Sequence, residues 1–279
     1  MRLLTFLERR ERRQPFAEPG SARRERKAAR DVRLFLHQLR SEQRVFWRNR
    51  ESAVFLFIFP IMLFVLLGSF YTGDMIVGYP AVDVLLAGMI GYGAANTGFA
   101  GMAITLVIRR EYGILKRLRS TPLPAPVYFA SALGSTLIVF ALQTVVLYAL
   151  GRLLYGTSFP EDVFSVAFLV LFGAIAFTGL GVGLASLIRS AEGASAVVNV
   201  VLLPMAFLSG SFGVREYPAF LEAIADALPL KHFIELVIGA SLAGEAPWSN
   251  PQALAIVAAW GVAGAVLAAR RFTWEPKER

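Results

Sequence analysis

Six long runs of residues without a charged side chain dominate the pattern along the chain. About 20 apolar residues cross the ~30 Å hydrocarbon core of a bilayer as a helix, and backbone amides in lipid need partners within their own segment. Each run therefore predicts a transmembrane helix, and the alternating ten-residue segments of a membrane barrel are absent. The pattern predicts an all-α integral membrane protein with six transmembrane helices, at residues 53–71, 84–108, 120–151, 163–188, 193–214 and 246–269.

The residues before the first run have a different pattern. Residues 1–30 are rich in Lys and Arg and include helix breakers such as Pro19, which predicts a basic tail near anionic lipid. From Asp31, which can cap a helix, apolar and basic residues alternate at helical spacing. This pattern is typical of an amphipathic helix in the membrane interface. We therefore expect the transmembrane domain at residues 31–271 and a C-terminal tail at residues 272–279.

The segment between the fifth and sixth runs is interrupted several times. Pro204 lies inside the fifth run, and two shorter apolar pieces follow at residues 217–229 and 233–243. Neither piece is long enough to cross a bilayer, and broken helices at membrane depth must be buried in protein or line a cavity. We expect two short, amphipathic or re-entrant helices on the outer side before the sixth span.

Composition agrees with a membrane protein, since 56% of the residues are hydrophobic and only 17% are charged. The net charge of +8 would suggest nucleic-acid binding in a soluble protein. Here 25 of the 28 Lys and Arg residues fall on one side of the expected membrane, at residues 1–52, 109–120, 189–193 and 270–279. Basic residues in short loops mark the cytoplasmic side, so we expect both termini in the cytoplasm and no nucleic-acid partner.

Residues that could carry bond-breaking chemistry are scarce. The chain has no cysteine, only two histidines and no GxxxxGK[ST] phosphate loop. The polar residues within the apolar runs are few, and an intramembrane amide either ties helices together or contacts a substrate. We keep both roles open for the three candidate pathway residues, which are Asn96, Gln143 and Asn199.

The loop after the second run has a distinctive order of residues. It contains an acidic residue, a glycine, a short amphipathic turn with basic residues, and a Thr-Pro pair. An ordinary positively charged loop would explain the basic residues, but not the apolar strip of Ile114, Leu115 and Leu118 or its limits at Gly113 and Pro122. These features indicate a short amphipathic helix in this loop, and the residues that define it are Glu111, Tyr112, Gly113, Leu115, Leu118, Thr121 and Pro122.

This loop resembles that of the type 2 ABC transporter permeases, with Ile114 in place of the usual Thr. The resemblance extends over residues 31–271 and includes Pro204, 207–210, Pro218 and 228–229. It implies six spans, an amphipathic entry helix, a cytoplasmic coupling helix after span two and outer re-entrant helices before span six. It also implies that two permease copies, identical or different, assemble with a separate ATP-binding subunit.

The resemblance implies a permease subunit of an exporter in the bacterial plasma membrane. We expect it to move a hydrophobic or amphipathic substrate, such as a drug or lipid, because the spans are weakly polar. ATP and Mg²⁺ would bind the partner subunit, so this chain would bind no cofactor or metal and would not itself be an enzyme. A polysaccharide or glycolipid export permease of the same family is the alternative. A membrane-embedded enzyme or a non-transporting scaffold is the alternative of another class.

Overall fold

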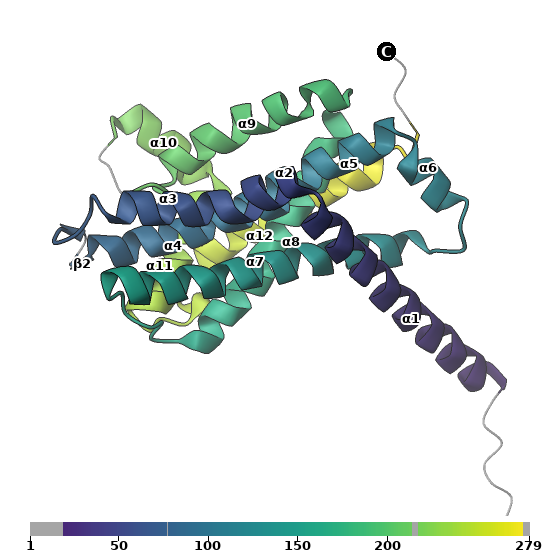
Figure 1. Ribbon diagram of the computed structural model, residues 1–279, viewed down its shortest axis with the longest axis horizontal. Helices are drawn as coiled ribbons and strands as arrows, with labels where there is room; N and C mark the ends of the chain where they lie inside the picture. The colour runs from purple at the N-terminus through teal and green to yellow at the C-terminus, as the bar shows by residue number, and fades with distance from the viewer. Residues whose placement is uncertain (1–18, 77, 214–216, 276–279) are drawn as a thin grey trace, which may run out of the picture.

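The computed structural model describes residues 19–76, 78–213 and 217–275. The described chain is mainly helical, with one short antiparallel strand pair, and its helices form a bundle from which α1 projects (Figure 1). The elements are α1 Pro19–Arg48, α2 Arg50–Ala53, η1 Val54–Ile58, α3 Phe59–Gly68, β1 Met75–Ile76, β2 Tyr79–Pro80, α4 Ala81–Ala94, η2 Ala95–Gly101, α5 Met102–Glu111, α6 Ile114–Arg119, α7 Ala125–Tyr155, α8 Val163–Leu187, α9 Ala191–Leu208, α10 Ala219–Ala227, α11 Pro229–Leu242, η3 Pro247–Ser249 and α12 Pro251–Arg271.

Four helices of the described chain, α7, α8, α9 and α12, are long and apolar enough to cross a membrane. The two other expected spans are also helical, but each is interrupted by a π-helical segment. The first is composed of α2, η1 and α3, and the second of α4, η2 and α5. The apolar runs therefore predicted helices correctly, whereas the two π-helical interruptions were not foreseen.

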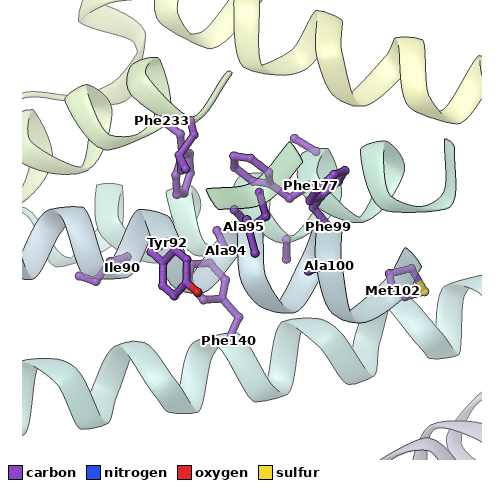
Figure 2. Close-up of a cluster of buried hydrophobic side chains, with 14 of the residues drawn as sticks. Ile90, Tyr92, Ala94, Ala95, Phe99, Ala100, Met102, Phe140, Phe177 and Phe233 are labelled. Atoms are coloured by element: carbon purple, nitrogen blue, oxygen red, sulfur yellow. The ribbon is translucent and has the colours of Figure 1, made fainter. Parts of the chain in front are cut away.

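The second of these helical segments forms the centre of the bundle. Every residue of α4 and η2 is buried, and this segment contacts α3, α7, α8 and α11. Figure 2 shows aromatic side chains converging on it from neighbouring helices, with the rings of Phe177 and Phe233 5.5 Å apart. Because the segment is surrounded by protein, its packing fixes the positions of its two ends relative to the neighbouring helices.

Helices α8 and α12 form the closest pair in the bundle. Gly179 lies against the backbone of Gly261, and Gly183 against that of Gly264, so closely that a Cβ atom at either α8 position would lie within 2.7 Å of the α12 backbone. Small residues permit this approach of two helices, which in lipid is stabilised by van der Waals packing. These glycines therefore fix the position of α12 on α8.

Helix α1 differs from the expected interfacial helix in where it begins. It starts at Pro19 rather than at Asp31, so the expected helix cap at Asp31 is wrong. Proline is tolerated in the first turn of a helix, where its missing N–H has no intrahelical partner. Residues 19–30 of the expected tail therefore form the first part of α1. Residues 1–18 of that tail lie outside the described residues. The C-terminal part of α1 packs on α7, where the Gln43 amide donates to the Ser135 carbonyl over 3.0 Å.

The region before the last span contains the two expected short helices, α10 and α11. Pro204 lies within α9 and does not end it. Pro218 immediately precedes α10, and Pro229 is the first residue of α11. Helix α11 is buried against α4, α8 and α12, while α10 contacts α9. These contacts agree with short helices held within the protein; their membrane depth and side remain predictions.

Candidate coupling site

The basic ends of α5 and α12, together with α6, form one end of the bundle, called the basic end below (Figure 1). Here α5 turns sharply into α6 through Gly113, whose φ of +68° lies in the left-handed region that favours glycine. Helix α6 then ends before Pro122, as the sequence predicts. The loop after α5 therefore contains the expected short helix, 114–119.

Residues 109–111, called the triplet below, connect the end of α5 to four other helices. Arg109 forms a bidentate ion pair with Glu42 of α1, with N–O distances of 2.8 and 2.6 Å. Its guanidinium also donates to the Tyr128 hydroxyl of α7 over 2.9 Å, and Gln38 donates to Glu42. The Arg109 and Glu42 side chains are only 13% and 8% exposed. This planar, two-bonded pair fixes both distance and orientation between α1 and α5.

Arg110 points to a different partner, the C-terminal end of α8. Its side chain is buried and donates to the carbonyls of Ala185, over 2.9 Å, and of Ile188. The last carbonyls of a helix lack intrahelical donors, and a positive charge is favourable at this negative end of the helix dipole. Arg110 therefore holds α5 against the end of α8.

Glu111 completes the triplet at the beginning of α9. Its carboxylate accepts a hydrogen bond from the backbone N–H of Ala191, the first residue of that helix. The Ser190 side chain accepts from Gly193 in the same turn. A carboxylate is favourable at the positive N-terminal end of a helix. Glu111 therefore ties the beginning of α9 to the end of α5, directly before the turn into α6.

Helix α6 presents a different surface from the one that its sequence suggested. Leu115 is completely buried within the chain, whereas Tyr112 and Ile114 are 69% and 41% exposed. Leu118 is half-buried, and the Thr121 hydroxyl donates to its carbonyl over 2.6 Å and closes the helix end. The expected apolar strip is thus divided, with Leu115 anchoring α6 and its neighbours facing outward.

The sequence matches the family described as ABC-2 type transporter over residues 33–242. The chain belongs to this family. It is 25% identical to a Bacillus subtilis protein named as transport permease YvfS, over 73% of this chain and 83% of that protein. It is also 25% identical to an Escherichia coli K12 protein named as multidrug ABC transporter permease YbhR, over 48% of this chain and 37% of that protein.

Two of the three candidate pathway amides of this ABC-2 permease bind backbone instead of facing open space. Asn96 donates to the carbonyl of Phe55 over 2.9 Å, and Gln143 donates to the carbonyls of Leu56 and Phe57. Both amides thus converge on η1. The third, Asn199, lies apart on the exposed face of α9 and donates to Ser195 one turn earlier.

The permease also contains functional partners that the sequence did not reveal. Glu42 and Tyr128 are 67 and 19 residues away from Arg109 along the chain, and no local spacing links them. The only signal for Glu42 was an isolated acid among the arginines of α1. In the part of the chain that the structure describes, no group of three His, Asp or Glu side chains is arranged to hold a metal ion.

Proposed function

We propose that this ABC-2 permease is the membrane subunit of an ATP-driven exporter, and that α6 is its coupling helix. The observation that supports this proposal is the triplet, which joins the segment before α6 to α1, α7, α8 and α9. A displacement of α6 would therefore reach four helices through short, charged contacts. Such a connection converts a docking event at one loop into a change of the whole bundle.

The partner would be a cytoplasmic ATP-binding subunit that supplies ATP and Mg²⁺. Tyr112, in the turn after α5, and Ile114, at the start of α6, provide exposed apolar surface, and exposed Lys116, Arg117 and Arg119 surround them with positive charge. Short helices dock in grooves through a few apolar or aromatic anchors. In this proposal Leu115 has a structural role, because its burial keeps α6 against the bundle.

The basic end would face the cytoplasm of a bacterial cell, with both termini on that side. Positive charge near the ends of the spans supports this orientation. The two helical segments interrupted by η1 and η2, together with α7, α8, α9 and α12, would make six crossings. Helix α1 would lie in the cytoplasmic interface, since its arginine-rich and apolar positions repeat at helical spacing.

The cargo would be hydrophobic or amphipathic, such as a drug or lipid. Asn96 and Gln143 are engaged with the backbone of η1, which leaves few polar side chains within the crossings for a strongly hydrated substrate. The name of the similar E. coli protein includes multidrug transport, which agrees with such a cargo.

Two permease copies would form the transport unit, either identical or different. Helix α9 carries a row of exposed apolar side chains, Val197, Val200, Val201, Leu203 and Phe207. Its contacts within the chain are mainly with α5, η2 and α10. A second copy could cover this face, and Glu111 would connect the resulting interface with α6.

Reconstitution tests the proposed function directly. The permease is co-expressed with a candidate ATP-binding subunit from the same organism, and the complex is purified and placed in lipid vesicles. We expect ATP-dependent movement of a fluorescent lipid or a hydrophobic dye, and none with an ATP-binding subunit that cannot hydrolyse ATP. A complex that hydrolyses ATP but moves neither class of cargo would overturn the proposed substrate class. Failure of the two proteins to assemble would overturn the coupling proposal.

A further inference from the structure

A cavity of about 250 Å³ lies between α1, η1, α7 and the helical segment formed by η2 and α5. Its lining is mainly apolar, with contributions from Leu56 and Met102, and it also includes the polar side chains of Glu42, Asn49 and Arg109. The volume is slightly below the ~300–1,000 Å³ of typical small-molecule pockets. The cavity is therefore suited to a narrow, amphiphilic molecule or to one alkyl chain of a larger one.

The length of the cavity matches one leaflet of a bilayer. Its lining on the second span extends from Thr97 to Arg109, which is about 18 Å at ~1.5 Å per residue. Half of the hydrocarbon core measures about 15 Å. In the proposed orientation the Arg109 end lies at the cytoplasmic interface, so an alkyl chain could enter there and reach the middle of the membrane.

Both π-helical segments of the described chain border this cavity. Leu56 belongs to η1, and Thr97 and Gly101 belong to η2. Gly101 allows the two segments to approach, since a Cβ atom there would lie 2.8 Å from the Leu56 side chain. π-Helical turns interrupt regular packing and occur frequently at functional sites. Here both π-helical segments contribute residues to the wall of the cavity beside α1.

The chain beside one lining residue, Asn49, carries a net positive charge. Glu42 is neutralised by Arg109 within the lining. Asn49 lies between the exposed residues Arg48 and Arg50, at the junction of α1 and α2. Even with the exposed Glu51 included, basic residues exceed acidic ones next to Asn49. An anionic headgroup would therefore be favoured over a zwitterionic or cationic one.

We propose that the cavity binds one alkyl chain of an anionic phospholipid from the cytoplasmic leaflet, with its phosphate held near Arg48 and Arg50. This proposal rests on the orientation given under the proposed function, but not on the presence of an ATP-binding subunit. A lipid in this position would fill the space between α1 and α5, beside the Arg109–Glu42 pair. It would thereby stabilise the attachment of the amphipathic helix to the bundle.

Lipid retention by the purified, full-length chain tests the proposal. The protein is delipidated in detergent and incubated with phosphatidylglycerol or phosphatidylcholine of identical acyl chains, and the bound lipid is measured by mass spectrometry. We expect phosphatidylglycerol to be retained at least about tenfold more and to raise the temperature of thermal unfolding. Equal retention of the two lipids by the unmodified protein would overturn the proposed headgroup recognition.

Substitutions that fill the cavity separate this site from general lipid binding. Thr136→Phe on α7 and Thr105→Phe on α5 place a ring in the lining from opposite sides. Either variant that remains monodisperse should lose most of the retained phosphatidylglycerol. The matched control is Ile138→Phe, two residues further along α7, where the side chain is exposed and does not line the cavity. This variant should retain lipid normally. Unchanged retention in both filled variants would overturn the site.

Charge substitutions test the headgroup position independently. Arg48→Gln combined with Arg50→Gln should abolish the preference for phosphatidylglycerol. The control, Arg33→Gln combined with Arg40→Gln, lies nearer the N-terminus of α1 and should preserve this preference. If a hydrophobic cationic dye binds and Thr136→Phe prevents this, while phosphatidylglycerol does not bind, the cavity is a cargo site and the lipid proposal is wrong. Because no ATP-binding subunit is present, a failure here is distinguishable from a failure of ATP-driven transport.

Discussion

The side-chain amide of Gln143 lies 3.1 Å from the carbonyl oxygen of Leu56. In a regular helix this carbonyl would accept a hydrogen bond from residue 60, four positions later. Residue 60 is proline, which has no N–H to donate. Gln143 of α7 therefore supplies, from another helix, the donor that Pro60 removes from the helical segment of α2, η1 and α3. This contact supports the structural role of the two that the sequence left open for Gln143.

Replacement of Gln143 by leucine should destabilise the permease. The variant leaves the Leu56 carbonyl without this donor in a partly buried, apolar environment, which costs about 1–2 kcal/mol. We expect a lower temperature of thermal unfolding in detergent, measured by static light scattering. Asn199→Leu is the matched control, because its amide is exposed on α9. Equal effects of the two substitutions would contradict the structural role of Gln143.

The Arg109–Glu42 pair should contribute more to stability than any exposed ion pair of the basic end. Removing one partner of a buried pair leaves the other charge uncompensated, at a cost of about 3–5 kcal/mol. Arg109→Gln and Glu42→Gln should each lower the unfolding temperature, and their effects should not add in the double variant. Lys116→Ala, which breaks the exposed 3.6 Å pair with Glu275, should cost less than about 1 kcal/mol. Additive effects at Arg109 and Glu42 would argue against direct coupling between them.

Helix α6 should bind the ATP-binding subunit through its exposed side chains. Tyr112→Ala and Ile114→Asp remove the exposed anchors and should weaken co-purification by tenfold or more, since an interface anchor is worth about 2 kcal/mol. The permease itself should remain folded in both variants. Lys116→Ala should have little effect on binding. Leu115→Asp should instead reduce the yield of folded protein, because that side chain is completely buried.

Cysteine labelling should locate the two ends of the bundle. The chain has no cysteine, so single cysteines at Arg117 in α6 and Ala223 in α10, both exposed positions, can be labelled without background. An impermeant maleimide added to intact cells should label residue 223 and leave residue 117 unlabelled until the membrane is opened. Labelling of both residues from outside would rule out the proposed orientation.

The beginning of α8 should be stabilised by the charge of Asp162. Hydrogen bonds from the Ser165 hydroxyl and backbone hold the pKa of Asp162 below its usual value. A carboxyl whose pKa is lower in the folded state stabilises above its unfolded pKa of 3.8 and loses this effect as the pH falls through the folded pKa. Asp162→Asn should therefore reduce the fall in unfolding temperature below about pH 4. An unchanged acid response would contradict this contribution.

The sequence by itself determined that the long apolar segments of the described chain are helical. Uninterrupted apolar length is a local property, and lipid permits only a helix for such a segment outside a barrel. Gly113 and Pro122 likewise set the limits of α6, because left-handed φ and the absence of an N–H act within one or two residues. The order of these residues also sufficed to indicate the ABC-2 family.

Only the tertiary structure decided which side chains are exposed to a partner and which are buried or bonded within the chain. Leu115 and Ile114 are adjacent and equally apolar, yet one is buried and the other exposed, because the packing of α6 against the bundle determines its outward face. Glu42 meets Arg109 across 67 residues, and Gln143 reaches η1 across 87. Such pairs depend on how helices that are distant in sequence cross in space, and helical periodicity carries no information about that crossing.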